Sequence, residues 1–194
     1  MKYQVLLFDA DGVVLRSSRL FSEQLESEYG IKNEKLQPFF KGVFKDCALG
    51  RADLKEELAK VIADWGWQGT GEELLQYWFS KGTSVDTEIV EYIQSLCQIG
   101  VRCFMTTNQE KYRSEYLQNF LGHSKVFERV FYSAQIGATK KQPEYFQFVY
   151  KHLDGISKNQ ILLIDDDEEN IEAAKIFGFE THFFTTLDGL KKIL

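Results

Sequence analysis

Cysteine, proline and long apolar stretches are all scarce in this chain of 194 residues. The three cysteines, Cys47, Cys97 and Cys103, are odd in number and lack metal-ligand spacing. This argues against a disulfide scaffold or a zinc site and predicts free thiols in a reducing compartment. Only two prolines occur, and no repeat or low-complexity segment is visible. No apolar stretch approaches the length of a membrane span, so no membrane partner is expected.

Positive charge is also in short supply. Lysines and arginines number 23 against 29 acidic residues, a formal net charge of -6, so general binding of nucleic acid through a basic surface is not expected. Met1 to Gln4 lead straight into a predicted strand and leave no room for a signal peptide, so we expect a cytoplasmic protein. The length suits one good core with an insert or a small second domain.

An acidic pair follows the first predicted strand. The apolar run Val5–Phe8 is short and unbroken, which is typical of a strand covered on both faces in a parallel sheet. Asp9 and Asp11 follow, two residues apart, so an extended backbone would point both carboxylates the same way; Gly12 then permits a sharp turn. Two such carboxylates repel each other unless a cation lies between them. On this stretch alone, a strand followed by an ordinary polar turn explains the residues equally well.

The last part of the chain alternates short apolar strands with helical patterns. Alternation of this kind implies crossover connections, a parallel sheet and helices on both of its faces. We therefore predict an α/β fold with a doubly wound parallel sheet. The later strands are expected at 101–106, 130–132, 161–164 and 181–184.

The stretch between the first strand and this alternation reads as helices alone. Asp53 to Glu56 and Thr70 to Glu73 have the form of capping boxes, and all three tryptophans lie in this block. The segment 31–50 is harder to read, because Pro38 and two glycines, Gly42 and Gly50, interrupt it.

We accordingly predict a core of residues 1–16 and 84–194, with residues 17–83 inserted as a helical cap domain. Ligands bind beyond the carboxyl ends of the strands in open sheets of this kind. An insert that leaves the first strand there would stand over the site as a lid, with Gly82 able to absorb rotation at its return crossing.

Polar side chains follow each of the inner predicted strands. One strand ends in Thr107 and Asn108, another in Asp165 and Asp166, and a basic pair, Lys140 and Lys141, follows the short strand at 130–132. Singly, each has a plain explanation, because threonines cap helices, lysines solvate loops and acidic runs form exposed turns. Together they place carboxylates, a hydroxyl and an ammonium group at one edge of one sheet.

This set of groups suits phosphoryl transfer. Asp9 can attack phosphorus and form an aspartyl phosphate, and Asp11 can protonate the leaving oxygen and later activate water. Clustered carboxylates need a hard divalent cation, and oxygen ligands of this kind favour Mg²⁺. Thr107 and nearby backbone N–H groups would hold the phosphate oxygens, and a lysine would offset their charge.

The same residues resemble the haloacid dehalogenase (HAD) superfamily, whose four motifs occur here in order across nearly the whole chain. The run from Asp9 to Val13 resembles the first motif and Thr107-Asn108 the second. Lys140 resembles the motif lysine, since it lies six residues before Phe146 and three before Pro143; Lys141 stands where a proline is usual. Asp165 and Asp166, with Asn170 behind them, resemble the fourth. The insert matches the helical cap, and Leu49 to Asp53 is similar to the branch of alpha-D-glucose-1-phosphate phosphatase and the N-terminal phosphatase domain of soluble epoxide hydrolase.

The resemblance implies a magnesium-dependent phosphatase that acts on a small phosphorylated metabolite, such as a sugar phosphate, through an aspartyl phosphate. It makes Asp9 the nucleophile, Asp11 the acid/base, and Thr107, Asn108 and Lys140 the phosphate-binding residues. It assigns Mg²⁺ to Asp9, the Asp11 backbone carbonyl and Asp166, with Asp165 orienting the lysine and contributing through water.

Four alternatives remain at this level. A phosphonatase should have a Schiff-base lysine in its cap, but the alanine expected in place of the first motif's second aspartate is not there. A dehalogenase would use the same attacking aspartate on carbon, but it lacks a carboxylate two residues on, so Asp11 argues against it. A non-catalytic binding or regulatory protein can share the fold. A phosphoacceptor signalling domain also gathers Asp, Thr and Lys at strand ends, but without a large insert. The sequence leaves the specific substrate open, as well as the choice between a monomer and a homodimer.

Overall fold

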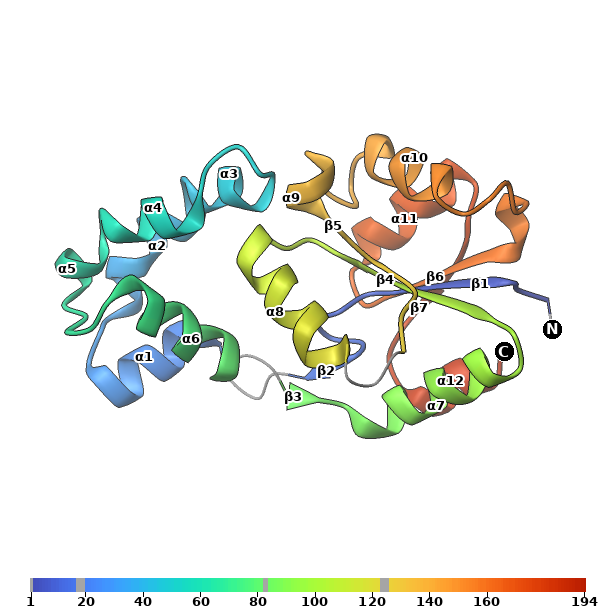
Figure 1. The fold of residues 1–194 in the computed structure, drawn as a ribbon, viewed down its shortest axis with the longest axis horizontal. Helices are drawn as coiled ribbons and strands as arrows, with labels where there is room; N and C mark the ends of the chain where they lie inside the picture. The colour runs from blue at the N-terminus through green and yellow to red at the C-terminus, as the bar shows by residue number, and fades with distance from the viewer. Residues whose placement is uncertain (1, 17–19, 82–83, 123–125) are drawn as a thin grey trace.

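The computed structural model describes residues 2–16, 20–81, 84–122 and 126–194. Five strands form one parallel sheet in the order β5-β4-β1-β6-β7, which confirms the predicted doubly wound α/β class (Figure 1). Because β1 lies between β4 and β6, the residues that follow it fall at the centre of the sheet's carboxyl edge. The strands are β1 (Val5–Phe8), β4 (Arg102–Thr107), β5 (Val130–Tyr132), β6 (Ile161–Asp165) and β7 (Glu180–Phe183).

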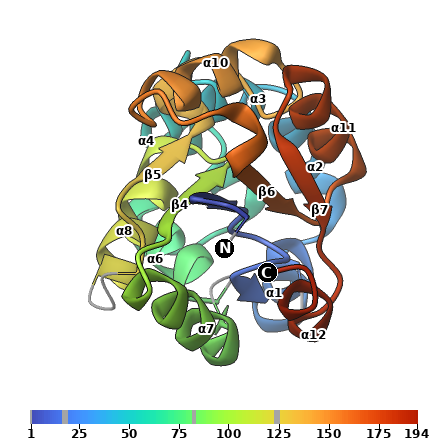
Figure 2. The same cartoon turned by 90° about the vertical axis from the view of Figure 1, so that its right-hand side faces the viewer.

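The two faces of the sheet carry separate apolar clusters. Along β1 the side chains alternate between them: Leu6 and Phe8 belong to one cluster and Val5 and Leu7 to the other. All four are fully buried, which explains why the strand lacks a polar alternation. Figure 2 shows α7 and α12 on one side of the sheet and α10 and α11 on the other. The helices that follow the insert are α7 (Thr87–Gln98), α8 (Lys111–Gly122), α9 (Ser133–Ile136), α10 (Pro143–Lys151), α11 (Glu168–Phe177) and α12 (Leu187–Lys191), with a 3₁₀ turn at Lys158–Gln160.

The described part of the predicted insert consists of six helices at one end of the molecule, and both chain termini lie at the other end (Figure 1). These helices enclose a third apolar cluster that is rich in aromatic rings. Phe21 stacks on Trp78 at 4.8 Å between ring centroids, and Phe39 meets Trp65 edge-on at 5.4 Å. The helices are α1 (Phe21–Tyr29), α2 (Asn33–Lys41), α3 (Phe44–Ala48), α4 (Leu54–Ala59), α5 (Ile62–Trp65) and α6 (Gly71–Lys81).

Segment 31–50, which is hard to read from the sequence, is mostly helical. It forms α2, with Pro38 inside it, and the short α3. Leu36 and Phe39 are buried from α2 and Cys47 from α3, so packing against the other insert helices offsets the breakers in the local sequence. The expected capping box forms before α6, where Thr70 and Glu73 exchange hydrogen bonds, whereas at α4 the structure shows the N-cap, with the Asp53 side chain accepting the backbone N–H groups of Lys55 and Glu56.

The two chain crossings between sheet and insert lie side by side. They form a two-residue antiparallel ladder, β2 (Leu15–Arg16) with β3 (Ser84–Val85), which the sequence did not indicate. Arg16 adds an ion pair with Asp86 at 2.6 Å. The predicted hinge residue Gly82, with residues 17–19 and 83, lies outside the described residues. Among the described helices, none combines the length and apolar character needed to cross a lipid bilayer.

Candidate active site

The carboxyl edge of the sheet opens into a cavity of about 600 Å³. Its walls come from the segments that follow β1, β4 and β6 and from the loop before α10, because parallel strands end at the same edge. Every site residue predicted from the sequence lines it except Asp165, which lies fully buried beneath. The lining residues are Asp9, Asp11, Gly12, Thr107, Asn108, Gln109, Lys140, Asp166, Asp167, Glu168 and Asn170.

Lys140 is the lysine of this cavity. Its fully buried ammonium group lies 2.7 Å from Asp9 Oδ1 and 2.6 Å from Asp165 Oδ2, and it also donates to the Thr106 carbonyl at 3.3 Å. Asn108 Oδ1 accepts the Lys140 backbone N–H at 2.9 Å, which fixes the lysine loop against the end of β4. Lys141, one place on, is exposed and pairs instead with the carboxylate of Glu169 at 2.5 Å.

The charges in this cluster are unbalanced. Burial raises the pKa of Asp9 to about 7, the Lys140 ammonium opposes that rise, and the Asp165 carboxylate adds to it. Burial alone would lower the pKa of Lys140, but the two carboxylates together raise it. One buried cation therefore faces more negative charge than it offsets, which is the electrostatic condition for binding a further cation.

Asp165 and Asp166 occupy different environments, although they are adjacent. Asp165 accepts the backbone N–H of Asp167 at 2.9 Å and the Asn170 amide at 3.1 Å, in addition to Lys140. Both of its oxygens thus already accept hydrogen bonds from protein donors. Burial, followed by the charge of Asp165, raises the pKa of Asp166.

The position of Gly12 leaves no room for a side chain, because the Asp166 carboxylate lies against it. Its φ is +84°, and a Cβ added there would fall 1.9 Å from Asp166 Oδ2. The turn after β1 and the close approach of Asp166 thus both depend on a residue without a side chain.

The donor set fits a hard divalent metal ion. Asp9, Asp165 and Asp166 each offer a carboxylate oxygen, and these oxygens all lie within 4.8 Å of one another. Asn170 Oδ1 nearby is buried without a hydrogen-bond partner in the described protein. Several anionic oxygens at this spacing, with an unused amide oxygen beside them, match the preference of Mg²⁺ for oxygen ligands. The Asp11 carboxylate is outside this group, so its predicted contribution is limited to the backbone carbonyl.

Asp11 instead faces α8, and sequence reasoning missed its two partners. Arg113 Nη2 lies 2.6 Å from Asp11 Oδ1, and Gln109 Nε2 lies 2.5 Å from Asp11 Oδ2. Strand β1 ends at Phe8, so the rule that residues two apart share a face does not extend to Asp11, and the carboxylates of Asp9 and Asp11 have different partners. The only local signal for Arg113 was its place in the first turn of the helix that follows Thr107 and Asn108.

Thr107 lines the cavity as predicted, but its backbone amide is already engaged. That N–H donates to the Tyr145 hydroxyl at 2.9 Å, and the hydroxyl donates to the Phe131 carbonyl at 2.8 Å. Tyr145 is fully buried on α10, and nothing in the surrounding sequence singles it out. The phosphate donors expected here are therefore the threonine side chain and the amides that follow it, and not the Thr107 N–H.

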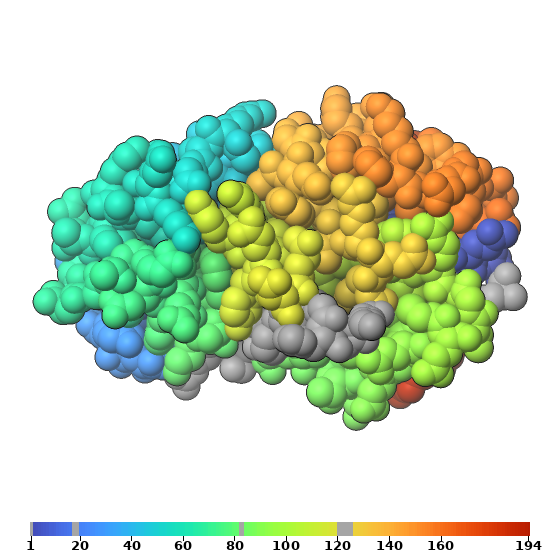
Figure 3. Space-filling model, viewed as in Figure 1, coloured from blue at the N-terminus to red at the C-terminus, as the bar shows by residue number. Residues whose placement is uncertain are grey.

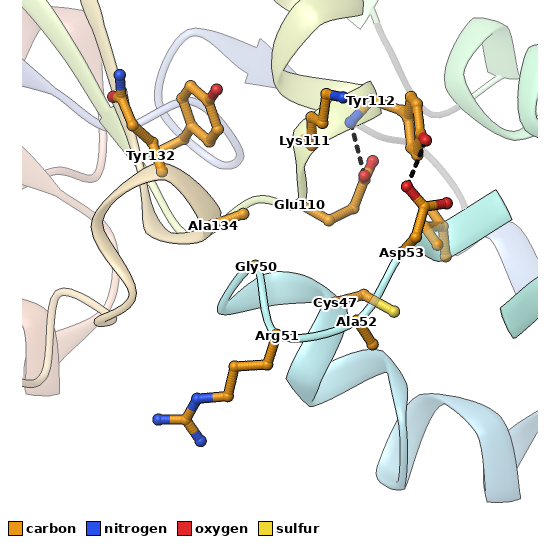
Figure 4. Close-up of a pocket in the computed structure, with 12 residues that line it drawn as sticks. Cys47, Gly50, Arg51, Ala52, Asp53, Glu110, Lys111, Tyr112, Tyr132 and Ala134 are labelled. Atoms are coloured by element: carbon orange, nitrogen blue, oxygen red, sulfur yellow. Dashed lines mark hydrogen bonds between the residues drawn. The ribbon is translucent and has the colours of Figure 1, made fainter. Parts of the chain in front are cut away.

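A second pocket, of about 310 Å³, lies between the insert and the core (Figure 4). Its insert wall is the α3–α4 loop, whose Asp53 carboxylate accepts a hydrogen bond from the Tyr112 hydroxyl at 2.6 Å. Nearby, Ser133 Oγ donates to the Ala48 carbonyl at 2.6 Å. The Arg51 side chain points away from this pocket (Figure 4). In the space-filling view, α8 fills the space between the insert and the rest of the core (Figure 3).

The chain is similar to known proteins over nearly its whole length. A family model described as haloacid dehalogenase-like hydrolase matches residues 3–178. A D-ribitol-5-phosphate phosphatase from Bacteroides thetaiotaomicron is 26% identical over 186 residues, covering 91% of this chain and 89% of that protein.

Solved structures agree in fold. A HAD family enzyme from Bacteroides thetaiotaomicron superposes with a TM-score of 0.83 at 18% identity, covering 100% of this chain and 98% of that one. A structure of the wild-type form of that enzyme, in complex with magnesium and inorganic phosphate, gives a TM-score of 0.79 at 20% identity, with 94% of each chain covered.

Proposed function

The chain belongs to the haloacid dehalogenase-like hydrolases and is a phosphomonoester hydrolase, and from this premise we propose that it is a magnesium-dependent phosphatase of small phosphorylated sugars or polyols. The observation that carries the proposal is the buried Lys140 between Asp9 and Asp165, with the Asp166 carboxylate beside them, at the floor of an open cavity. The polyol phosphate named for the similar Bacteroides phosphatase supports the choice of substrate class.

The proposed reaction has two steps. A carboxylate oxygen of Asp9 attacks phosphorus, a new Asp9 O–P bond forms, and the bond from phosphorus to the leaving oxygen breaks; Asp11 gives that oxygen its proton. Water then attacks the aspartyl phosphate, Asp11 takes a proton from the water, and the Asp9 O–P bond breaks. Inorganic phosphate leaves, and both aspartates return to their starting states.

The other residues of the cavity neutralise charge and fix the positions of the reacting groups. Lys140 fixes the attacking carboxylate by an ion pair of 2.7 Å and faces the transferring group with a positive charge. Mg²⁺, held by Asp9, Asp166 and the backbone carbonyl of Asp11, would neutralise phosphate charge when bound. Asp165 holds Lys140, and Asn108 holds the loop that carries it.

The helical insert, residues 17–83, is proposed as the lid over this cavity. Its α3–α4 loop contacts Tyr112 through Asp53, and the end of α3 contacts Ser133 through Ala48. Tyr112 follows the cavity residues Asn108 and Gln109 closely along the chain. Closure of a lid excludes water and strengthens the charges around the phosphate. Residues of this loop are therefore the first place to look for substrate selection.

The direct test measures, with and without added Mg²⁺, phosphate release from p-nitrophenyl phosphate, D-ribitol 5-phosphate and several sugar phosphates, and halide release from a 2-haloacid. We expect Mg²⁺-dependent turnover of the phosphate esters and none of the haloacid. Asp9→Asn should abolish turnover in a folded protein, because the amide lacks the nucleophilic charge. Asp188→Asn, at an exposed carboxylate on α12, is the matched control and should stay active. An active Asp9→Asn protein would rule out the mechanism.

A further inference from the structure

The first turn of α8 and the short segment before it provide donors to both oxygens of the Asp11 carboxylate. Arg113 Nη2 donates to Oδ1 at 2.6 Å, and Gln109 Nε2 donates to Oδ2 at 2.5 Å. Two donors from one short segment therefore fix the Asp11 side chain. The Asp11 side chain is 45% exposed at the cavity, whereas that of Arg113 is 14% exposed. A half-exposed acid at the cavity mouth is thus anchored by a mostly buried base.

The anchor is itself built into the fold. The Glu110 carboxylate accepts the backbone N–H groups of Tyr112 and Arg113 at 2.6 and 2.5 Å, which fixes the start of the helix. The Gln109 carbonyl accepts hydrogen bonds from the Ala134 backbone N–H and from the Ser133 hydroxyl, both at 3.2 Å. Arg113 Nε is buried without a hydrogen-bond partner among the described residues. The Arg113 guanidinium thus leaves Nε unused in the described protein, while its Nη2 bonds Asp11.

We propose that Arg113 and Gln109 are positioning residues that hold the Asp11 carboxyl toward the leaving oxygen of the substrate, an inference that rests on the proposed phosphatase function. A carboxyl group that accepts these two bonds keeps further capacity: its O–H, when protonated, can donate to the leaving oxygen, and a free lone pair, when ionised, can accept from a water. The clamp removes rotation of a half-exposed side chain, and misplacement of a catalytic group by ~1 Å can reduce the rate on the order of 10²-fold.

A positioning role for Arg113 and a purely structural ion pair predict different effects on kcat/KM. If Arg113 acts through Asp11, its loss should lower kcat/KM most for esters whose leaving oxygen depends most on protonation. Phenyl phosphate has a poorer leaving group than p-nitrophenyl phosphate and therefore depends more on the acid. A purely structural pair would reduce turnover of both esters by the same factor.

The experiment compares kcat/KM for these two esters, with Mg²⁺ present, in wild type, Arg113→Met, Arg113→Lys and Gln109→Leu. We expect Arg113→Met to lose roughly tenfold or more on phenyl phosphate beyond its loss on p-nitrophenyl phosphate. Arg113→Lys should recover part of that difference, since it keeps the charge and one donor. Arg102→Met is the matched control, because Arg102 pairs with Glu128 and Asp154 at the far end of β4.

The outcomes separate the two proposals. Equal losses on both esters, or no rescue by lysine, would overturn the positioning role while leaving the phosphatase assignment in place. A wild-type protein without turnover of either ester would overturn the phosphatase assignment and this inference with it. If Arg113→Met fails to fold, Gln109→Leu decides the question by the same ratio, because it removes one of the two bonds without changing any charge.

Discussion

Lys140 and Lys141 are adjacent residues with opposite environments. Lys140 is fully buried between two carboxylates, whereas Lys141 is exposed and bonded to acidic residues at the start of α11. We predict that Lys140→Ala lowers kcat by at least about 10²-fold, because the nucleophile loses both its anchor and its counter-charge. Lys141→Ala should leave kcat nearly unchanged, since exposed ion pairs contribute little.

Steady-state kinetics on p-nitrophenyl phosphate, with melting temperatures measured in parallel, test this pair. Lys140→Ala also leaves two buried carboxylates unpaired, so a folded protein must first be verified. Severe loss of activity in Lys141→Ala alone would reverse the assignment.

Glu110 gives the molecule a pH-dependent stability. Burial raises the pKa of this carboxyl above its ordinary 4.5, although the backbone N–H groups of Arg113 and Tyr112 oppose the rise. Just above pH 4.5 the folded state therefore binds more protons than the unfolded state, so the free energy of unfolding falls as pH rises. The Glu110 contribution is fully present below the unfolded pKa and is lost as pH rises through the folded pKa.

We predict that Glu110→Gln flattens this part of the stability profile. The free energy of unfolding, measured by urea denaturation from mildly acidic to neutral pH, should fall less steeply in the variant than in wild type. Glu115→Gln, at an exposed carboxylate of the same helix, is the control and should keep the wild-type slope. Identical slopes in Glu110→Gln and wild type would show that Glu110 titrates normally.

At the scale of elements, the α3–α4 loop meets α9 too closely for any side chain at Gly50. Gly50 has a φ of +67°, and an added Cβ would fall 2.2 Å from the Ala134 carbonyl oxygen. Gly30 has nearly the same φ, +69°, but nothing lies within 4 Å of its added Cβ. The two glycines thus differ mainly in whether the insert touches the core there.

We predict that Gly50→Ala and Gly30→Ala both lose about 1–2 kcal/mol of stability from the left-handed backbone. Only Gly50→Ala should also lower kcat/KM, because it pushes the insert loop away from α9. Urea denaturation measures the first effect and kinetics on a sugar phosphate the second. Equal kcat/KM in the two variants would mean that contact between this loop and α9 does not matter for turnover.

At the scale of the whole molecule, the acidic cluster should link folding to Mg²⁺. Asp9, Asp165 and Asp166 come from two strand ends that unfolding separates, so Mg²⁺ should bind the folded protein preferentially. We predict a stabilisation of about 2.7 kcal/mol at ~100 times the dissociation constant. The gain should vanish with a chelator and shrink in Asp166→Asn, but persist in Asp188→Asn.

Thermal melts over a Mg²⁺ titration provide the measurement. The rise in melting temperature should saturate as a single site does. A melting temperature that does not change with Mg²⁺, or a full rise in Asp166→Asn, would show that Mg²⁺ does not bind at this acidic cluster.

The α/β class and most of the cavity could be predicted from local patterns in the sequence. Apolar runs and helical periodicity are local properties, so the strands and most core helices could be predicted from them, and strand ends in a parallel sheet share one edge. That rule alone predicts that Asp9, Thr107 and Asp166 lie together, and all three line the cavity. Resemblance to the family's motif spacing also selected Lys140 over Lys141, and a lysine one place along on an extended segment points the other way.

The partners of Asp11, the helices around Pro38 and the docking of the insert on the core depend on contacts between residues far apart in the sequence. The pairing of Asp11 with Arg113 and Gln109 spans about a hundred residues and depends on β4 lying beside β1. The helices α2 and α3 form around Pro38 and Gly42 because aromatic packing in the insert outweighs local propensity. The docking of the α3–α4 loop on α8 and α9 is likewise a long-range contact, since complementary surfaces far apart in sequence meet only when the chain has folded.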